Sequence, residues 1–462
     1  MTVTNSMTVT NTTEAPLREI KSLSAEKIAN IARESGIVGA GGAGFPTYVK
    51  LQSKAEIFLV NAAECEPMLK VDQQLMVSHA RELIQGIRYG MKATGAKEGI
   101  IALKAKYKKA IATLTPLLTN NIRIHILPDV YPAGDEVITI WLATGRRVPP
   151  AQIPISIGVV VNNVQTLINL AKAIDEQKPV THRTLTINGA VNKPMTLTVP
   201  IGTKMSELIE LAGGCTVDNP EFINGGPMMG KYISDINAPV SKTTGGILVF
   251  PREHLLIQRR LKTDQQIIAM AKTVCEQCRL CTDLCPRHII GHELSPHELV
   301  KSMSYKQFAK PSTLLSALTC SECSVCESYA CPVEISPMRI NQILKGELRA
   351  QKAKYEGELE PQDPMAEHRL VPIGRLVKRL NLLPYYHEAP MVEPQWQPEF
   401  VSIPLQQHIG APSVAIVSVG DHVEAGDCIA KAAPDALSVA QHASITGTIT
   451  EIGTKFITMR RG

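Results

Sequence analysis

The chain has 462 residues, of which 44% are hydrophobic, and its formal net charge is +5 at pH 7. This length predicts about three domains with ordinary packed cores, and the basic residues are spread along the chain, which argues against nucleic acid as a partner. No uninterrupted apolar run reaches the roughly 18 residues that a transmembrane helix needs, so no membrane-spanning segment is expected.

The first 20 residues are predicted to be a disordered tail. They are polar and rich in threonine, and the segment MTVTN occurs at residues 1–5 and again at 7–11, which makes Met7 a candidate alternative start. Ser24 then precedes a short amphipathic pattern, so we expect it to cap a helix from Ala25 to about Glu34.

A glycine-rich segment with the sequence GAGGAGFPT spans residues 39–47. Glycines allow backbone N–H groups to approach a phosphate closely, so this segment is a candidate phosphate-binding loop. Gly39, Gly41 and Gly44 satisfy the GxGxxG spacing, but a dinucleotide-binding motif of that kind needs a strand before the loop, and here a helix precedes it. A plain flexible turn is the alternative interpretation.

Helices and strands are expected to alternate from residue 57 to about residue 180. The first strand ends at Asn61 and runs into Glu64 and Glu66; two carboxylates and an amide suit the ligand-binding edge of an open α/β sheet. The order βαβα is typical of a parallel sheet with helices on its faces. The predicted strands are 57–61, 99–103, 122–127 and 157–161, and the predicted helices are 77–94, 104–117 and one that residues 131–136 open.

Residues 181–250 change in character. Two short β-rich segments, 184–188 and 195–199, are predicted to form a hairpin, and a helix is predicted over 205–212. This small ββα unit is expected to be a β-grasp (SLBB) domain.

Eight of the 11 cysteines fall in two runs within residues 264–350, which are expected to form a helical domain. Each run has three cysteines at two-residue intervals and a fourth just before a proline, as in the bacterial motif that binds four-iron four-sulfur clusters. In two-cluster ferredoxins the fourth cysteine ligates the other cluster. We therefore predict one 4Fe–4S cluster on Cys275, Cys278, Cys281 and Cys331, and a second on Cys320, Cys323, Cys326 and Cys285.

Two other interpretations of the cysteines fit the pattern less well. A zinc site needs two CxxC pairs, but a third cysteine in register and a Cys-Pro close each run here. A disulfide framework needs an oxidising compartment, and no signal peptide is visible. The second run is one residue longer before its last cysteine, which loosens the match at Cys331 only. The remaining cysteines are expected to be small core or loop residues: Cys65, Cys215 and Cys428.

Two segments complete the chain. Residues 351–405 contain eight prolines and are predicted to be a linker, with a short basic helix that carries Arg375, Lys378 and Arg379 on a solvated face. Residues 406–462 are predicted to be a compact β module whose turn spacing is similar to that of biotinyl and lipoyl barrel-sandwich domains. No lysine lies in the predicted hairpin tip, 442–447, so we expect a structural module and not a swinging arm.

The glycine loop resembles the flavin-binding loop of the superfamily that contains the complex I 51-kDa subunit and RnfC, in which the loop contacts FMN and NADH. Three further segments match that superfamily in order, although it has acidic residues in place of Ala63 and Gln165, and glutamate in place of Asp135. The cofactor-binding residues that the resemblance implies are Gly39, Gly41, Gly42, Gly44, Phe45, Lys50, Asn61, Glu64, Glu66, Gly134, Asp135, Glu136, Asn162, Asn163 and Thr166.

The resemblance also implies a role for groups of these residues. The amides of the glycine loop, with Lys50, would hold the FMN phosphate. Asn61, Glu64 and Asn163 would orient the flavin ring and ribityl chain, and Phe45 and Glu66 would bind NADH. No catalytic side chain is expected, because the hydride and electron chemistry belongs to the cofactors.

The twin cysteine runs are similar to those of RnfC, and residues 408–412 match its barrel-sandwich module, which is N-terminal there and C-terminal here. The resulting domain order is similar to that of the cobalamin reductases of propanediol-utilisation microcompartments. The implied fold is a multidomain α/β protein with an FMN/NADH domain (21–180), the β-grasp domain (181–250), a two-cluster ferredoxin-type domain (264–350), the linker and the barrel-sandwich domain (406–462).

The function implied is NADH-dependent reduction of cob(III)alamin and cob(II)alamin toward cob(I)alamin for adenosylation. It would take place in the cytoplasm, within or attached to a microcompartment, and an adenosyltransferase, a shell protein and further copies of the chain would be partners. The chain has no D-x-H-x-x-G corrinoid signature, so corrinoid is expected to bind transiently or at a partner surface. Two alternatives stay open: an RnfC-like subunit that passes electrons to a ferredoxin, quinone or partner protein, and a non-catalytic scaffold that bears clusters.

Overall fold

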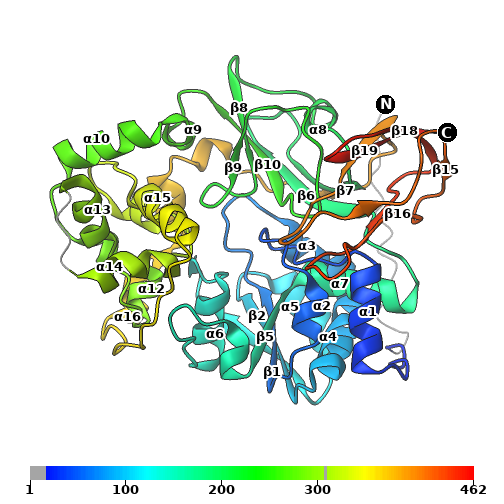
Figure 1. The fold of residues 1–462 in the computed structure, drawn as a ribbon, viewed down its shortest axis with the longest axis horizontal. Coiled ribbons are helices and arrows are strands. Elements are labelled where there is room, and N and C mark those ends of the chain that lie inside the picture. The colour runs from blue at the N-terminus through cyan, green and yellow to red at the C-terminus, as the bar shows by residue number, and fades with distance from the viewer. Residues whose placement is uncertain (1–16, 306–309) are drawn as a thin grey trace.

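The computed structural model describes residues 17–305 and 310–462. Most of the predicted tail, residues 1–16, lies outside this range. Figure 1 shows four units: an α/β unit at the bottom, a mixed sheet above it, a helical unit on the left and a small β module on the right. Among the described residues, no helix combines the length and the apolar character that crossing a membrane would require.

The α/β unit is built on a four-stranded sheet in the order β3-β2-β1-β5, and all its strand pairs are parallel. The strands are β1 (Ile57–Ala62), β2 (Glu98–Lys104), β3 (Ile122–Leu127) and β5 (Val159–Asn163). The prediction of a parallel sheet is therefore confirmed. The strand order reverses between β1 and β5, so their carboxyl ends form a topological switch point, the usual ligand-binding crevice of such sheets.

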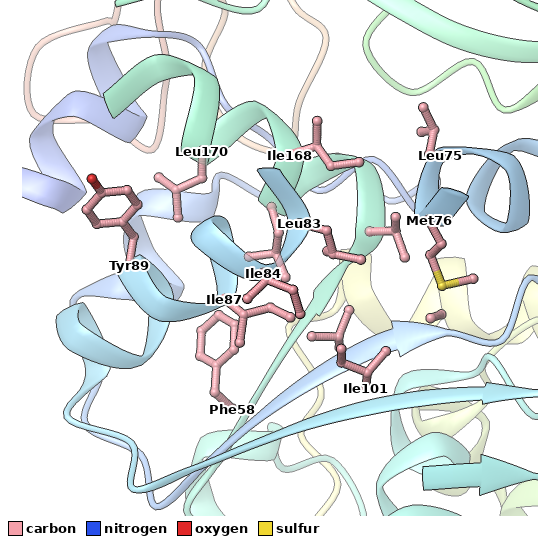
Figure 2. Close-up of a cluster of buried hydrophobic side chains, with 14 of the residues drawn as sticks. Phe58, Leu75, Met76, Leu83, Ile84, Ile87, Tyr89, Ile101, Ile168 and Leu170 are labelled. Carbon is pink, nitrogen blue, oxygen red and sulfur yellow. The ribbon is translucent and has the colours of Figure 1, made fainter. Parts of the chain in front are cut away.

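Helices cover both faces of this sheet, with α4 and α7 on one face and α6 on the other. Figure 2 shows the apolar side chains between α4, α7 and the sheet, including Phe58, Leu83, Ile87 and Ile168. A side chain at Gly90 would collide with the Phe58 ring, so glycine is needed for this close approach. The helices are α1 (Ala25–Glu34), α2 (Thr47–Leu51), α3 (Val71–Ser78), α4 (Ala80–Thr94), α5 (Lys108–Leu114), α6 (Glu136–Thr144) and α7 (Val164–Asp175).

Some boundaries differ from the predictions. The helix predicted over 77–94 is two helices, α3 and α4, which meet at His79. The helix predicted from residue 104 begins at Lys108, because Lys104 is the last residue of β2. The strand predicted from residue 157 begins at Val159, because residues 154–157 form a 3₁₀ turn that ends at Gly158 with φ +74°.

The mixed sheet has the strand order β12-β7-β6-β10-β8-β9. The predicted hairpin is confirmed as the antiparallel pair β6 (His182–Gly189) and β7 (Met195–Pro200). The predicted helix is confirmed as α8 (Met205–Leu211). The remaining strands are β8 (Pro220–Asn224), β9 (Lys231–Ile233), β10 (Gly246–Pro251) and β12 (Met391–Val392).

Residues 351–405, predicted to be a linker, are built into three of the units. β11 (Val371–Pro372) pairs with β4 (Val130–Tyr131) of the α/β unit, and β12 pairs with β7. β13 (Phe400–Pro404) pairs with β19 (Phe456–Arg461) of the C-terminal module. The predicted basic helix is present as α17 (Ile373–Arg379), and its apolar face is buried. The high proline content is compatible with these roles because the short strands lie at sheet edges.

The helical unit carries the two cysteine runs on short helices and tight turns. Its helices are α9 (Leu255–Leu261), α10 (Asp264–Val274), α11 (Leu280–Asp283), α12 (Pro286–Ile289), α13 (Pro296–Tyr305), α14 (Pro311–Leu315), α15 (Pro337–Ala350) and α16 (Ala366–Arg369). Ile289 and Ile290 belong to the same apolar core as α6, so this unit packs directly on the α/β unit.

The C-terminal module consists of two small sheets, β13-β19-β18-β15 and β14-β16-β17. The tip of its hairpin is buried, and the Ser444 hydroxyl donates to the carbonyl of Ile201 at 2.6 Å. A tip held in this way agrees with a structural module. The remaining strands are β14 (Val414–Ala415), β15 (His422–Val423), β16 (Cys428–Lys431), β17 (Gln441–His442), β18 (Gly447–Ile452) and β19 (Phe456–Arg461).

Candidate functional site

The glycine loop lies at the switch point of the parallel sheet. Asn61 at the end of β1 is in register with Asn163 at the end of β5. The backbone N–H of Ala40 donates to the Thr166 hydroxyl at 2.9 Å, which fixes the loop over the first turn of α7. Gly42 has φ +112°, and a side chain there would meet no atom within 4 Å. The loop therefore presents backbone to open space beside a helix N-terminus, as a phosphate-binding loop requires.

The other units of the chain hold this loop in place. The buried guanidinium of Arg183 donates to the carbonyls of Ala40 at 2.8 Å and Thr244 at 2.6 Å. Burial lowers the pKa of Arg183 to about 10, although the Asp72 carboxylate opposes this shift. From the C-terminal module, the N–H of Ile409 donates to the carbonyl of Gly44 at 3.2 Å. Arg183 was not predicted as a site residue, because nothing in its local sequence indicates this distant contact.

The two asparagines at the strand ends orient neighbouring segments. The Asn61 side chain donates to the carbonyl of Gly134 at 2.7 Å. Asn163 caps α7 by accepting from the N–H of Gln165 at 2.9 Å, and it donates to the Asp72 carboxylate at 2.8 Å. The asparagines therefore link the end of the sheet to the turn before α6 and to the first turn of α3.

Glu64 and Asp72 form a buried acidic pair beside this link. The Glu64 carboxylate accepts from the N–H groups of Asp72 at 2.8 Å and Gln73 at 3.3 Å, so it caps the first turn of α3. Burial raises the pKa of Asp72 to about 8, and the nearby Glu64 charge raises it further. Burial also raises the pKa of Glu64. Asp72 was not predicted, and its only sequence signal is an acidic residue at a helix start.

Lys50 and Glu136, both predicted site residues, form an ion pair of 2.7 Å. The Lys50 ammonium also donates to the carbonyl of Val161 in β5 at 2.8 Å. Lys50 thus lies at the sheet end with its charge already paired. Its predicted contact with a phosphate stays a prediction.

Glu66 contacts a loop of the mixed-sheet unit. Its carboxylate accepts from the N–H groups of Met228 at 3.0 Å and Met229 at 2.8 Å. Burial raises the pKa of Glu66 to about 7, against the opposing effect of these two hydrogen bonds. A side chain at Gly226 would collide with this carboxylate, so the glycine permits the contact. The predicted contact of Glu66 with NADH is not tested by this arrangement.

The remaining predicted residues border the same region. Phe45 is half-buried and its carbonyl accepts from the N–H of Gly39 at 2.8 Å. Gly134 lies so close to Cys65 that an added Cβ would be 2.9 Å from the sulfur. Asp135 caps α6 by accepting from the N–H groups of Val137 and Ile138, both at 3.1 Å.

Three buried polar atoms near the switch point have no hydrogen-bond partner among the described residues. They are Thr47 Oγ1 at the end of the glycine loop, Asn162 Nδ2 at the end of β5 and Gln165 Oε1 in the first turn of α7. Buried polar atoms are almost always paired in folded proteins. With the open space at Gly42, they fit a polar ligand such as a flavin phosphate and ring at this edge.

The eight cysteines of the two runs gather into two groups. The group that contains Cys275 borders a volume of about 370 Å³, here called the first thiol space. The group that contains Cys285 borders a volume of about 290 Å³, here called the second thiol space. The membership of the groups is the same as in the predicted ligand sets. In residues 17–305 and 310–462, no three His, Cys, Asp or Glu side chains are placed to hold a single metal ion. The first thiol space contains Cys275, Cys278, Cys281 and Cys331, and the second contains Cys285, Cys320, Cys323 and Cys326.

Backbone geometry explains how two cysteine runs that differ in length by one residue each contribute to a group of four thiols. The residues two and four positions after the first cysteine have positive φ in both runs: Gln277 and Arg279, then Glu322 and Ser324. The extra residue of the second run is taken up by a π-helical turn over Cys326–Ala330, in which the N–H of Cys331 donates to the carbonyl of Cys326 at 3.1 Å. The single added residue therefore leaves Cys331 able to reach the first thiol space.

Polar donors surround the sulfurs of the second thiol space. The N–H of Glu322 donates to Cys320 Sγ at 3.4 Å, and the Asn341 amide donates to the same sulfur at 3.7 Å. Burial raises the pKa of the Cys285 thiol to about 12, although the N–H groups of His288 and Arg287 oppose this shift. Such donors stabilise thiolates, which are the form that ligates iron, and they adjust the reduction potential of a bound cluster.

Comparison with protein-family models gives four matches along the chain. The Nuo51 FMN-binding domain matches residues 32–172, the SLBB domain 184–232, the 4Fe–4S dicluster domain 274–336 and the RnfC barrel sandwich hybrid domain 386–461. They confirm the predicted fold class and the predicted FMN and 4Fe–4S cofactors. The last match begins inside the segment predicted to be a linker.

Several curated proteins are similar to the chain. The cobalamin reductase PduS of Salmonella typhimurium is 62% identical, with 96% of this chain and 98% of that protein covered, and that of Citrobacter freundii is 60% identical, with 95% and 97% covered. One component of the proton-translocating ferredoxin:NAD(+) oxidoreductase complex of Clostridium ljungdahlii is 33% identical over 60% of each chain. Among solved structures, an air-oxidised NAD+-reducing [NiFe]-hydrogenase has a TM-score of 0.46 and 19% identity, covering 80% of this chain and 68% of that one.

Proposed function

The chain belongs to the family of the cobalamin reductase PduS, and from this premise we propose that it is an oxidoreductase that reduces cobalamin with electrons from NADH. The observation that supports the proposal is the 3.0 Å ion pair that joins Arg287, at the second thiol space, to Asp135, in the turn that opens α6. The proposed flavin site and the proposed cluster site would then lie at the contact between the two domains, which suits the transfer of electrons from one to the other.

The bound cofactors supply the chemistry: FMN accepts a hydride as two electrons, and 4Fe–4S clusters carry one electron each. The chain supplies binding and orientation. The amides of the glycine loop and the N-terminus of α7 would hold the FMN phosphate, and Thr166 fixes the loop for this role. Asn61 and Asn163 would orient the flavin, because their side chains connect the segments that border it.

The buried acidic pair would keep one proton beside the flavin site. Two carboxylates that are buried close together do not both ionise readily, because desolvation and mutual repulsion raise their pKa values. The pKa of Asp72, about 8, leaves this carboxyl mostly protonated at neutral pH. A proton held there would limit negative charge next to the flavin.

The partners and location are proposed on the resemblance to the family. We propose that corrinoid is bound transiently, that an adenosyltransferase receives the product, and that the chain acts in the cytoplasm within or attached to a microcompartment through a shell protein. We also propose that the chain forms an oligomer with further copies of itself.

An acceptor comparison tests the function. Purified, anaerobically reconstituted protein should reduce cobalamin with NADH faster than it reduces a ferredoxin or a quinone. In Cys323→Ala, NADH should still bleach the flavin in stopped-flow absorbance, whereas cobalamin reduction should fall strongly. Cobalamin reduction at full rate in that variant would contradict electron delivery by the clusters. Reconstituted protein that retains no flavin would favour a scaffold that bears clusters only.

A second candidate function is that of an RnfC-like electron-transfer protein. The observation that favours it is 33–35% identity to components of ion-translocating oxidoreductase complexes over about three fifths of the chain. Under this function, NADH would reduce ferredoxin or quinone in preference to cobalamin, and only when partner proteins are added. The same acceptor comparison therefore separates the two functions.

A further inference from the structure

Arg287 lies at the contact between the FMN-binding unit and the cluster unit. Its guanidinium forms an ion pair with the Asp135 carboxylate, with 3.0 Å between Nη2 and Oδ2. Both side chains are only 12% exposed. Arg287 is in α12, and Asp135 directly precedes α6; Figure 1 shows these two helices in neighbouring parts of the molecule. Since so little of the pair is exposed, salt in the solvent screens it less than it would a surface pair.

The same arginine borders the second thiol space. Arg287 is the second residue of α12, directly after Cys285 and Pro286, and it lines the volume that the four thiols border. Its buried Nε has no hydrogen-bond partner among the described residues. Buried N–H donors are normally paired, so this one is available to a sulfur of a cluster in that space.

Asp135 ties the arginine to the flavin side. One carboxylate oxygen accepts the two N–H groups at the start of α6, and the other accepts Arg287. A positive side chain, Arg287, is therefore fixed at the second thiol space, and its negative partner, Asp135, holds it from the side of the FMN-binding unit.

We propose that Arg287 and Asp135 are positioning residues that set the reduction potential of the cluster in the second thiol space. The proposal rests on the cluster content given under the proposed function. A positive charge and an N–H donor near cluster sulfurs favour the reduced, more negative cluster, which raises its potential. The Asp135 carboxylate offsets part of this effect and fixes the orientation of the guanidinium, so the pair adjusts the first one-electron carrier that faces the flavin domain.

Opposite shifts in potential test the proposal. In redox titrations of the reconstituted holoprotein followed by electron paramagnetic resonance, Arg287→Gln should move the midpoint potential of one cluster to a more negative value. Asp135→Asn should move the same cluster to a more positive value, since asparagine keeps the helix cap but loses the charge. The signal of the other cluster should stay in place in both variants.

Arg279→Gln is the matched control. Arg279 borders the first thiol space, but its side chain is 57% exposed, so solvent screens its charge and the loss should shift the other cluster less. Equal shifts of both clusters, shifts of the same sign in the two test variants, or no shift would overturn the proposal. If Arg287→Gln cannot hold its cluster, the sign of the shift in Asp135→Asn decides. These titrations need no cobalamin, so failure of the proposed acceptor and failure of this inference are distinguishable.

Discussion

The hydroxyl of Tyr131 donates a hydrogen bond to the carbonyl of Cys323, with 2.7 Å between the two oxygens. Tyr131 is in β4, four residues before Asp135, and Cys323 is the second of the four cysteines of the second run. The bond is fully buried, and 192 residues separate its partners in the chain. It is therefore a long-range tie between the turn that opens α6 and the backbone of a predicted cluster ligand.

Tyr131→Phe should remove this hydrogen bond and lower the stability of the folded protein without the loss of a cofactor. The change leaves a buried carbonyl unpaired, which costs about 1–3 kcal/mol. The free energy of unfolding from urea titrations should fall by that amount, and iron content should be unchanged. Tyr305→Phe is the control, because the Tyr305 hydroxyl donates to an exposed carbonyl, that of Lys272. Equal losses of unfolding free energy in the two variants would show that the buried bond to Cys323 stabilises the protein no more than an exposed one does.

Cys278→Ala should remove one of the two clusters. Two cubane clusters predict about eight iron atoms per chain, and this variant should keep about four, because Cys278 belongs only to the first thiol space. Iron and acid-labile sulfide analysis after anaerobic reconstitution measures the result. Cys215→Ala, which changes a half-buried thiol outside both spaces, should keep all the iron. Tightly bound zinc, or four iron atoms in the unmutated protein, would contradict the ligand sets.

Gly42→Val should abolish retention of FMN. A valine side chain would fill the open space that the glycine loop borders and would hold a phosphate away from the backbone amides. Flavin released by acid and identified by its absorbance and chromatography gives the measurement.

Gly214→Val controls for backbone strain in that experiment. Gly214 has φ +78° and also faces open space, but it lies in the mixed-sheet unit and far from the loop in sequence. The Gly214→Val variant should therefore retain FMN. Loss of flavin in both variants would mean that strain at positive φ, and not a blocked phosphate site, explains the result for Gly42.

Local sequence patterns were sufficient for much of the fold and of the cluster site. The parallel sheet, the hairpin of β6 and β7, and the grouping of the thiols depend on short-range periodicity and spacing, which a single sequence carries. The boundaries of α3 and α4 were missed because a break at His79 leaves no glycine or proline in the sequence. The π turn before Cys331 was also outside what spacing alone predicts.

Long-range contacts explain most of what was not predicted. Residues 351–405 were predicted to be a linker because eight prolines interrupt most of the local patterns, yet β11, β12 and β13 each pair with a strand from elsewhere in the chain. Arg183 and Asp72 take part in the flavin-site network through partners that are 143 and 91 residues away. Such contacts have no local signal, because they depend on how whole units are placed against each other.

Lys242 is another residue of this kind. It is buried where three units meet, and its amine donates to the carbonyls of Gly36 at 2.8 Å and Ala440 at 3.0 Å. Burial lowers the pKa of Lys242 to about 7, with only the Cys428 thiol opposing the shift. The neighbouring imidazoles are His408 and His442, whose pKa values burial lowers to about 4 and about 3. Two carbonyls use both N–H bonds of a neutral amine, which agrees with the lowered pKa.

The pH dependence of stability should reveal this lysine. Between pH 7 and about 10.4, the ordinary pKa of lysine, the unfolded chain binds a proton at Lys242 that the folded chain does not. The free energy of unfolding should therefore rise with pH in this window, by up to about 1.4 kcal/mol per pH unit from this group. The two histidines act below pH 6.5, so they do not contribute there.

Lys242→Met should remove that slope. Methionine fills a similar apolar volume and has no proton to exchange, so the variant should show a flatter dependence between pH 7.5 and 9.5 in urea unfolding followed by intrinsic fluorescence. All other titrating groups are shared by the two proteins, so the difference between their slopes isolates Lys242. Lys97 is exposed, so Lys97→Met should keep the slope of the unmutated protein. Parallel curves for Lys242→Met and the unmutated protein would contradict a neutral buried lysine at the junction of the three units.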